Sequence, residues 1–375
     1  MKELLLIPGP TPVSEEILNA LSIETIAHTD DRFVEIMLSA LNKTKEVFGT
    51  KTGFPFIIAG SGTLGMEIAL TNVINENDNL LVISHGFFGD RFAEIGNALG
   101  ITSEIIKAQP GDRVRLEEIK HKLDEKHFDI ITITHVDTST GVIADVEEIA
   151  SFVHIKSPET LILVDGVCAS GGVREEFDRW GVDVIFTGSQ KALAVPPGLT
   201  LLAFSSRAVE KRKSLKKMRT YYGDILKWFP VMEDPHKYFA TPAVNMVYAL
   251  EKSLSNIFSI GLENYFEKHI VLARRIRSAM KILGLEILAN YPAPTLSVFK
   301  YPEGIDDVQF RKALFRKGVV VAAALKELSG RYFRMGHMGS LSEEDLFIAL
   351  KRIIEVFEDL GIYTDKGRVF EAFFS

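Results

Sequence analysis

The sequence predicts an α/β protein with a mainly parallel, seven-stranded sheet domain and a smaller α+β domain at its C-terminal end. Over the first half of the chain, short apolar runs rich in Ile, Val, Leu and Phe alternate with stretches of helical length and spacing. Runs that are apolar throughout indicate strands buried on both faces, as in a parallel sheet covered by helices. The predicted strands span residues 54–59, 80–84, 101–106, 128–134, 161–165, 183–187 and 199–204.

The chain divides into three predicted segments. Residues 1–15 form an extended segment that contains the rigid run Pro8-Gly9-Pro10-Thr11-Pro12, and residues 16–262 form the large domain. Residues 263–375 form the small domain, in which apolar runs again alternate with helices. Ser342 caps an amphipathic helix whose apolar face comprises Leu346, Leu350, Ile353, Ile354 and Phe357.

Composition narrows the function classes. The chain has 375 residues, a formal net charge of −7 and one cysteine, Cys168. The negative charge disfavours general affinity for nucleic acid or an anionic membrane. One cysteine rules out an internal disulfide and a multi-cysteine metal site, and we predict no metal. The first apolar run stops at Pro8, and no segment is apolar over the ~18 residues that a membrane helix needs, so we expect a cytoplasmic protein.

A lysine follows the strand predicted at residues 183–187. It lies in Gly188-Ser189-Gln190-Lys191-Ala192-Leu193, among small and uncharged neighbours. Most lysines are solvated surface charges. An amine held at the end of a strand, with no acid beside it in the sequence, loses its proton more easily, and a neutral amine is a nucleophile.

A glycine turn ends the first predicted strand. Gly60-Ser61-Gly62-Thr63-Leu64-Gly65 matches the Gly-x-Gly-x-x-Gly dinucleotide fingerprint. In a nicotinamide-dependent dehydrogenase the next strand should end in the acid that binds the ribose, whereas this one leads into Ile83-Ser84-His85. A glycine turn that opens onto a helix nonetheless offers free N–H groups to a phosphate of any cofactor. The alternative is that these glycines have a structural role alone and only allow the chain to turn.

Other strand ends carry aromatic and acidic groups. Gly86-Phe87-Phe88 places rings either in the core or against a flat ligand, and residues 135–141 supply several hydroxyls. Asp165 ends an apolar strand, where a carboxylate is costly to bury without a positive partner such as a protonated pyridine nitrogen. With the glycine turn and Lys191, these groups meet the requirements of pyridoxal 5'-phosphate, which needs a Schiff-base lysine, an acid at the ring nitrogen and orienting contacts.

The motifs together resemble those of class V aminotransferases, above all the alanine–glyoxylate and serine–pyruvate enzymes. The resemblance runs over almost the whole chain and implies a fold-type I homodimer whose active sites lie at the subunit interface. It rests on Pro8-Gly9-Pro10, Gly60-Ser61-Gly62-Thr63, Ser139-Thr140-Gly141, Val164-Asp165, Gly188-Ser189-Gln190-Lys191-Ala192-Leu193, Pro196-Pro197-Gly198 and Arg334-Met335-Gly336-His337-Met338-Gly339.

The resemblance also implies a role for each matching residue. Lys191 would form the Schiff base and move the substrate proton, and Asp165 would pair with the pyridine nitrogen. Arg334 would bind the substrate carboxylate bidentately, which suits a planar guanidinium. The other implied cofactor and substrate residues are Val167 and Phe88 on the ring, Ser139 near the ring hydroxyl, Ser61, Gly62, Thr63 and Gln190 at the phosphate, Tyr238 and Thr241 from the neighbouring subunit, and Gly9 and Ser139 at the substrate.

Two departures from the family pattern bear on the substrate. Thr63 stands where the closest members often have His, and Ala322-Ala323-Ala324 replaces a glycine-rich turn. Both border the substrate pocket rather than the pair Lys191 and Asp165. The resemblance implies a ping-pong transfer of an amino group from serine or alanine to glyoxylate or pyruvate.

Three other functions are disfavoured by the sequence. A cysteine desulfurase-like lyase needs a mobile cysteine on a loop of the smaller domain, whereas Cys168 follows Asp165 and is more typical of a small core residue. A nicotinamide-dependent dehydrogenase lacks its ribose-binding acid. A binding module that keeps the fold without catalysis is disfavoured because both Lys191 and Asp165 are present.

Overall fold

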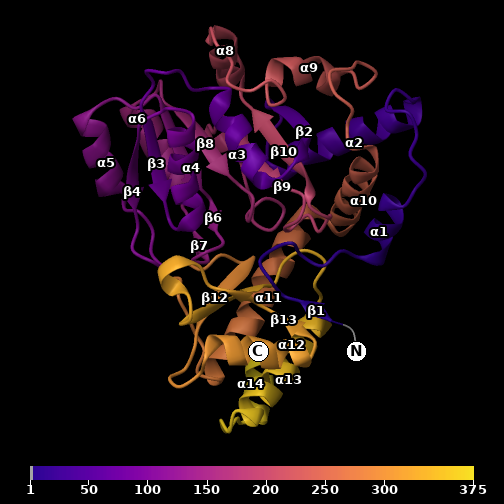
Figure 1. Cartoon of the computed structure of the whole chain (residues 1–375), viewed down its shortest axis with the longest axis vertical. Coiled ribbons are helices and arrows are strands. Elements are labelled where there is room, and N and C mark those ends of the chain that lie inside the picture. Colours follow the sequence, from indigo (N-terminus) through magenta and orange to yellow (C-terminus); the bar gives the residue numbers. More distant parts are fainter. Residues whose placement is uncertain (1–2) are drawn as a thin grey trace.

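The computed structural model describes residues 3–375, which form a large upper part and a small lower part in Figure 1. The large part is built on a seven-stranded sheet, and the small part on a four-stranded sheet. The predicted fold class is therefore confirmed.

All seven predicted strands form and join one sheet. Their bounds are β2 (Phe54–Gly60), β3 (Leu80–Ser84), β4 (Ser103–Lys107), β5 (Ile130–Thr134), β8 (Leu161–Asp165), β9 (Val184–Gly188) and β10 (Gly198–Phe204). The third and fourth strands begin two residues later than predicted, at Ser103 and Ile130. Every residue of β3, β5, β8 and β9 is buried, which requires cover on both faces of the sheet.

The order of the strands brings their carboxyl ends to one edge. The sheet runs β2-β10-β9-β8-β5-β3-β4, and only β10 is antiparallel to its neighbours. Because β10 is antiparallel to both β2 and β9, these two strands share the direction of the rest. Loops that leave β2, β3, β5, β8 and β9 therefore meet at the same edge, where ligands bind in sheets of this kind.

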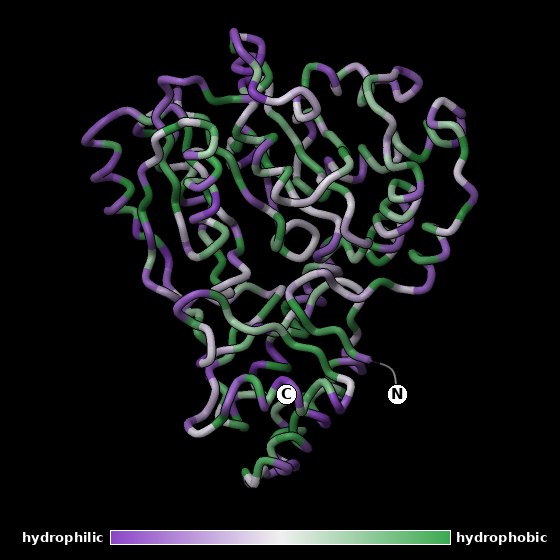
Figure 2. The backbone as a smooth tube through the Cα atoms, viewed as in Figure 1, coloured by the Kyte–Doolittle hydropathy of each residue, from purple (hydrophilic) through white to green (hydrophobic). Residues whose placement is uncertain are grey.

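Helices of the large part connect and cover these strands. They are α1 (Glu15–Leu21), α2 (Asp31–Val47), α3 (Gly62–Thr71), α4 (Phe87–Ala98), α5 (Leu116–Glu125), α6 (Val146–Lys156), α7 (Phe177–Trp180), α8 (Ser206–Ser214), α9 (Ile225–Glu233) and α10 (Val244–Ile260). Helix α3 packs on β9 and β10, and α4 packs on β3 and β4. Figure 2 shows hydrophobic residues along the central strands and hydrophilic residues on the outer helix α5.

The small part forms around the antiparallel order β11-β12-β15-β14. Its strands are β11 (Glu286–Ile287), β12 (Leu296–Lys300), β13 (Val319–Val320), β14 (Ala322–Ala323) and β15 (Tyr332–Gly336), and its helices are α12 (Asp307–Arg316), η1 (Lys326–Leu328), α13 (Glu343–Asp359) and α14 (Lys366–Phe374). Residues 319–323 form two short strands, β13 and β14. Strand β15 and helix α14 follow from no pattern noted in the sequence.

The N-terminal segment packs with the small part. Strand β1 (Leu4–Leu5) pairs in parallel with β13, and Leu4 and Leu6 join the same apolar core as α13. Helix α11 (Leu262–Ile282) contributes Tyr265 to the core of the large part and residues from Leu272 onward to that of the small part. The boundary near residue 262 stays a prediction. In residues 3–375 no helix is long and apolar enough to cross a membrane.

The amphipathic helix predicted after Ser342 forms as α13. Ser342 Oγ accepts a hydrogen bond from Asp345 N at 3.1 Å, and the Asp345 carboxylate accepts one from Ser342 N at 3.0 Å. This reciprocal cap satisfies N–H groups that the first turn leaves free. All five residues of the predicted apolar face are buried.

Candidate active site

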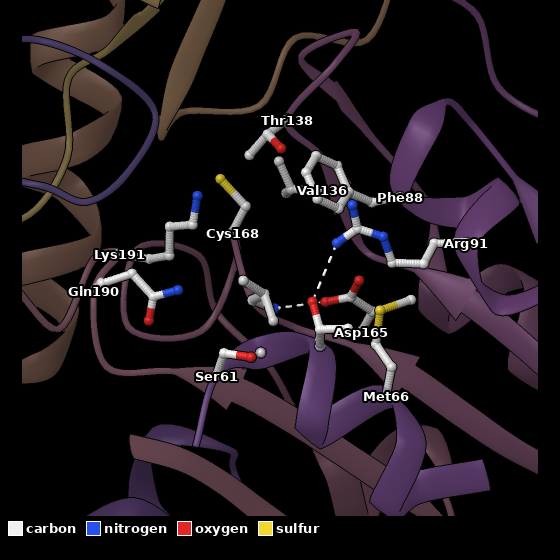
Figure 3. Close-up of a pocket in the computed structure, with 13 residues that line it drawn as sticks. Ser61, Met66, Phe88, Arg91, Val136, Thr138, Asp165, Cys168, Gln190 and Lys191 are labelled. Atoms are coloured by element: carbon white, nitrogen blue, oxygen red, sulfur yellow. Dashed lines mark hydrogen bonds between the residues drawn. The ribbon is translucent and has the colours of Figure 1, made fainter. Parts of the chain in front are cut away.

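A cavity of about 160 Å³ lies at the edge where the strand ends meet (Figure 3). Loops and helix starts after β2, β3, β5, β8 and β9 all contribute to its wall, because the parallel order places their carboxyl ends together. The residues that line it are Ser61, Gly62, Thr63, Met66, Phe88, Arg91, Val136, Thr138, Asp165, Val167, Cys168, Gln190 and Lys191.

Lys191 points into this cavity from the turn that follows β9. The turn is closed by a hydrogen bond from Ala194 N to Lys191 O at 2.9 Å, and Thr11 Oγ1 donates to the same oxygen at 2.8 Å. The Lys191 amine donates to the carbonyl oxygen of Pro8 at 2.7 Å. Burial lowers the pKa of Lys191 below its usual value. The amine is thus positioned and more readily deprotonated than a surface lysine.

Asp165 lies across the cavity from Lys191. Its Oδ1 accepts a hydrogen bond from Val167 N at 2.9 Å, and the residue is buried. Burial and the nearby negative charge of Asp137 raise the pKa of Asp165 to about 7. In residues 3–375 no Lys or Arg forms an ion pair with this carboxylate. A buried acid of this kind favours a positive partner supplied by a ligand.

The glycine turn after β2 becomes the first turn of α3. Ser61 is the N-cap, and the first backbone bond of the helix runs from Gly65 N to Ser61 O at 3.1 Å. Leu64 N donates to Ser61 Oγ at 3.5 Å, whereas the N–H groups of Gly62 and Thr63 are available to an anion, and the helix dipole adds positive potential there. A Cβ on Gly62 would lie 2.8 Å from Val167 Cγ2, so the close approach of turn and loop requires glycine.

An acid missed in the sequence, Asp137, organises the opposite wall. Its Oδ2 accepts from Phe88 N at 2.9 Å, which fixes the start of α4, and burial raises its pKa above the usual value. Its Oδ1 accepts from Ser139 Oγ at 2.6 Å, and that hydroxyl in turn accepts from Phe87 N at 2.9 Å. Ser139 therefore lies behind the wall, and Thr138 lines the cavity in its place. A polar residue three positions beyond the end of β5 was the only available signal.

Arg334 lies beside the cavity and contacts its wall. Strand β15 pairs with β12 and β14, which sets the guanidinium against Ala323 and Thr138. Nε donates to Ala323 O at 2.8 Å and one terminal nitrogen donates to Thr138 O at 3.4 Å. No Asp or Glu of the described chain forms an ion pair with Arg334, although the negative charge of Asp137 acts on the guanidinium electrostatically.

Three further residues named from the sequence fall in different places. Gly9 packs against Lys191, because a Cβ there would lie 2.4 Å from Lys191 Nζ. Tyr238 and Thr241 lie outside the cavity on the exposed surface, with their side-chain oxygens 3.5 Å apart. Their predicted role requires a second subunit and stays a prediction here.

Two other wall residues, Cys168 and Arg91, bear on the alternatives. Cys168 is buried, and burial raises the pKa of its thiol to about 11, which disfavours the thiolate that a desulfurase needs. Arg91 was not singled out in the sequence, although it lies one helical turn beyond Phe88. Its guanidinium donates to Thr63 Oγ1 at 3.1 Å (Figure 3).

Comparison with known proteins agrees with this geometry. The family model "Aminotransferase class-V" matches residues 14–324. The chain is 35% identical to alanine–glyoxylate aminotransferase 1 of Saccharomyces cerevisiae over 90% of this chain and 92% of that one. It is 30% identical to serine–glyoxylate aminotransferase of Arabidopsis thaliana, covering 95% and 90%. The crystal structure of alanine–glyoxylate aminotransferase from Nostoc sp. superposes with a TM-score of 0.91 at 28% identity, covering 95% and 96%.

These matches confirm the resemblance seen in the sequence motifs and the fold-type I architecture. They extend over most of the chain, so the likeness is not limited to the glycine turn that a dehydrogenase would share. The chain belongs to the class V aminotransferase family, a pyridoxal-phosphate-dependent family, and it is an aminotransferase.

Proposed function

We propose that this aminotransferase binds pyridoxal 5'-phosphate in the cavity and transfers an amino group from alanine or serine to glyoxylate or pyruvate. The observation that carries the proposal is that a half-buried amine, Lys191, and a buried acid, Asp165, line one cavity at the N-terminus of α3. When bound, the cofactor supplies an aldehyde that reacts with an amine and a ring that accepts electrons from a substrate carbon.

The residues of the cavity fit this cofactor. Asp165 forms no ion pair with a Lys or Arg of residues 3–375, and its raised pKa suits a protonated ring nitrogen, which the carboxylate would keep charged. The first turn of α3 offers N–H groups to a phosphate. The amide of Gln190, whose oxygen has no hydrogen-bond partner among residues 3–375, offers two further N–H donors. Phe88 and Val167 supply apolar surfaces for a flat ring.

Two basic residues would act on the substrate. Lys191 is the group in the cavity that can carry a proton to and from the substrate carbon, because burial lowers its pKa and so makes the neutral amine accessible. Arg334 would hold the substrate carboxylate at the border between the two parts of the chain, since no acid of the described chain occupies its guanidinium. The names of the relatives support glyoxylate as acceptor and alanine or serine as donors.

A homodimer belongs to the same proposal. Tyr238 is 64% exposed, and the hydroxyl of the exposed Thr241 lies beside its own. Large exposed aromatic rings are depleted on free surfaces and enriched at interfaces. We propose that these two residues reach the phosphate side of the neighbouring subunit's cavity, which would make each site complete only in the dimer.

Absorbance spectroscopy tests the function directly. Purified protein reconstituted with the cofactor should show the visible absorbance of a lysine-bound aldehyde, and Lys191→Ala should abolish it and the activity. Amino acids added one at a time should then bleach this band when they act as donors, and alanine and serine are expected to be the most effective. Absorbance that survives Lys191→Ala unchanged would rule out the proposal.

A further inference from the structure

Arg91 is a cation in the cavity wall, and the proposed function assigns no role to it. It extends from α4 beside Phe88 and donates a hydrogen bond to Thr63 Oγ1 at 3.1 Å (Figure 3). Its guanidinium lies 4.8 Å from the centre of the Phe88 ring and 5.0 Å from that of Phe87. Both contacts hold the group in place without neutralising its charge.

The charge of Arg91 is not matched by an acid of the protein. In residues 3–375 no Asp or Glu forms an ion pair with it. Of the residues that line the cavity, only Arg91 and Lys191 are basic, and Lys191 is committed to the bond with the cofactor in the proposed function. Arg91 is therefore the one wall cation that is free to compensate a bound anion.

The position of Arg91 shows which anion it would meet. Thr63 is the second residue of α3, so the guanidinium is hydrogen-bonded to the first turn of a helix whose N-terminal dipole also favours an anion. A phosphate monoester carries about −1.5 to −2 charges at pH 7. The other groups expected around it, Ser61, Thr63 and Gln190, are neutral, and an anion buried among neutral groups is costly.

We propose that Arg91 pairs electrostatically with the phosphate group of the cofactor and is held for this task by Thr63 and the two phenylalanine rings. This inference rests on the proposed function, because it takes the cofactor from it. The contacts with Phe87 and Phe88 are cation–π contacts, so the N–H groups of Arg91 that do not bond to Thr63 are left available to an anion.

A substrate carboxylate is the competing partner. Arg334 already serves that need from the small part, where it contacts Ala323 and Thr138. Arg91 bonds instead to α3, on the side of the cavity where the phosphate is expected. A dicarboxylic substrate would need a second cation for its second carboxylate. The experiment must distinguish this role of Arg91 from phosphate binding.

The test compares pyridoxal 5'-phosphate with pyridoxal, which has the same ring and aldehyde but no phosphate. Both are titrated by absorbance into cofactor-depleted full-length protein, for the wild type, Arg91→Gln, Arg91→Lys and Arg115→Gln. Arg115 has a side chain that is 75% exposed at the start of α5, so its variant loses the same charge away from the cavity.

For Arg91→Gln we expect Kd for pyridoxal 5'-phosphate to rise by about 10- to 100-fold, as for loss of a charge-assisted contact. Kd for pyridoxal should stay within about 3-fold of the wild-type value. Arg91→Lys should regain part of the loss, because it keeps the charge without the planar fork. Arg115→Gln should match the wild type. Thr63→Val should weaken binding less in the Arg91→Gln background than alone.

Equal losses for both aldehydes, or no loss for either, would overturn the assignment of Arg91 while leaving the proposed function intact. Unchanged Kd values with a raised apparent KM for aspartate but not alanine would assign Arg91 to a substrate carboxylate instead. If the wild-type protein bound neither aldehyde, the proposed function itself would be wrong. If Arg91→Gln fails to fold, Arg91→Lys is compared with the wild type instead. The proposal then requires that Arg91→Lys weaken the binding of pyridoxal 5'-phosphate but not that of pyridoxal.

Discussion

The amine of Lys191 donates a hydrogen bond of 2.7 Å to the carbonyl oxygen of Pro8, a residue 183 positions earlier in the chain. The N-terminal segment thus reaches over the large part and fixes the side chain on which the chemistry depends. A carbonyl acceptor binds an N–H of the amine and leaves the nitrogen lone pair of the neutral form directed elsewhere. The same segment also pairs with β13 of the small part, so Lys191 is linked to both parts of the molecule.

This contact predicts a specific sensitivity at Gly9. Its φ of +141° suits only glycine, and a Cβ would overlap the Lys191 side chain. Gly9→Ala should lower the free energy of unfolding by about 1–3 kcal/mol and weaken cofactor binding, as measured by denaturant unfolding and absorbance titration. Gly304 also has positive φ but nothing within 4 Å of an added Cβ. Gly304→Ala should therefore lower the free energy of unfolding through backbone strain alone. If Gly304→Ala weakened cofactor binding as much as Gly9→Ala, the prediction would be contradicted.

Asp165 predicts a pH dependence of the cofactor-free protein. Its pKa is raised from 3.8 to about 7 on folding, so between these values the folded state holds a proton that the unfolded chain has lost. Its contribution to stability is complete below about pH 4, falls as the pH rises and is lost above about pH 7. The fall amounts to at most about 4 kcal/mol.

Asp165→Asn should remove this slope, because the amide does not titrate. The measurement is the free energy of unfolding of the cofactor-depleted wild type and variant from pH 4 to 8, compared as a difference. Cofactor should flatten the wild-type curve, since a positive ring nitrogen favours the charged acid. Parallel curves for wild type and variant would show that the pKa of Asp165 is not raised.

Arg334 should affect substrates more than cofactor. Arg334→Gln removes a charge that we expect to bind the substrate carboxylate, so the apparent KM for alanine and for glyoxylate should rise about 10- to 100-fold. Cofactor absorbance should persist, because the cofactor-binding residues come from other elements. Arg334→Lys should recover little, since an ammonium cannot bind a carboxylate bidentately. Unchanged steady-state kinetics would remove Arg334 from the substrate site.

Substitutions of Thr138 and Ser139 should affect different properties, namely ligand affinity for Thr138 and stability for Ser139. Ser139 Oγ bonds to the buried Asp137 and to Phe87 N, so Ser139→Ala should cost about 1–3 kcal/mol in the free energy of unfolding. Thr138 lines the cavity, so Thr138→Val should change ligand affinity with a smaller effect on stability. Thermal unfolding and cofactor titration of both variants make the comparison. The reverse pattern would restore Ser139 to the ligand site.

The sequence by itself determined the strands and the two central residues. Apolar runs report burial along a strand, and all seven strands of the large sheet follow from them. Lys191 and Asp165 were found because the carboxyl ends of parallel strands converge, so residues that follow different strands can be expected at one site.

The tertiary structure decided which side chains face the cavity. Whether Thr138 or Ser139 lines it depends on the hydrogen bonds of Asp137, and whether Arg91 enters it depends on the packing of α4 against α3. Neither is encoded in a periodic pattern, because loop and helix-start side chains are oriented by contacts between segments distant in sequence. The bond between Lys191 and Pro8 is of the same kind, since only folding brings these two residues together.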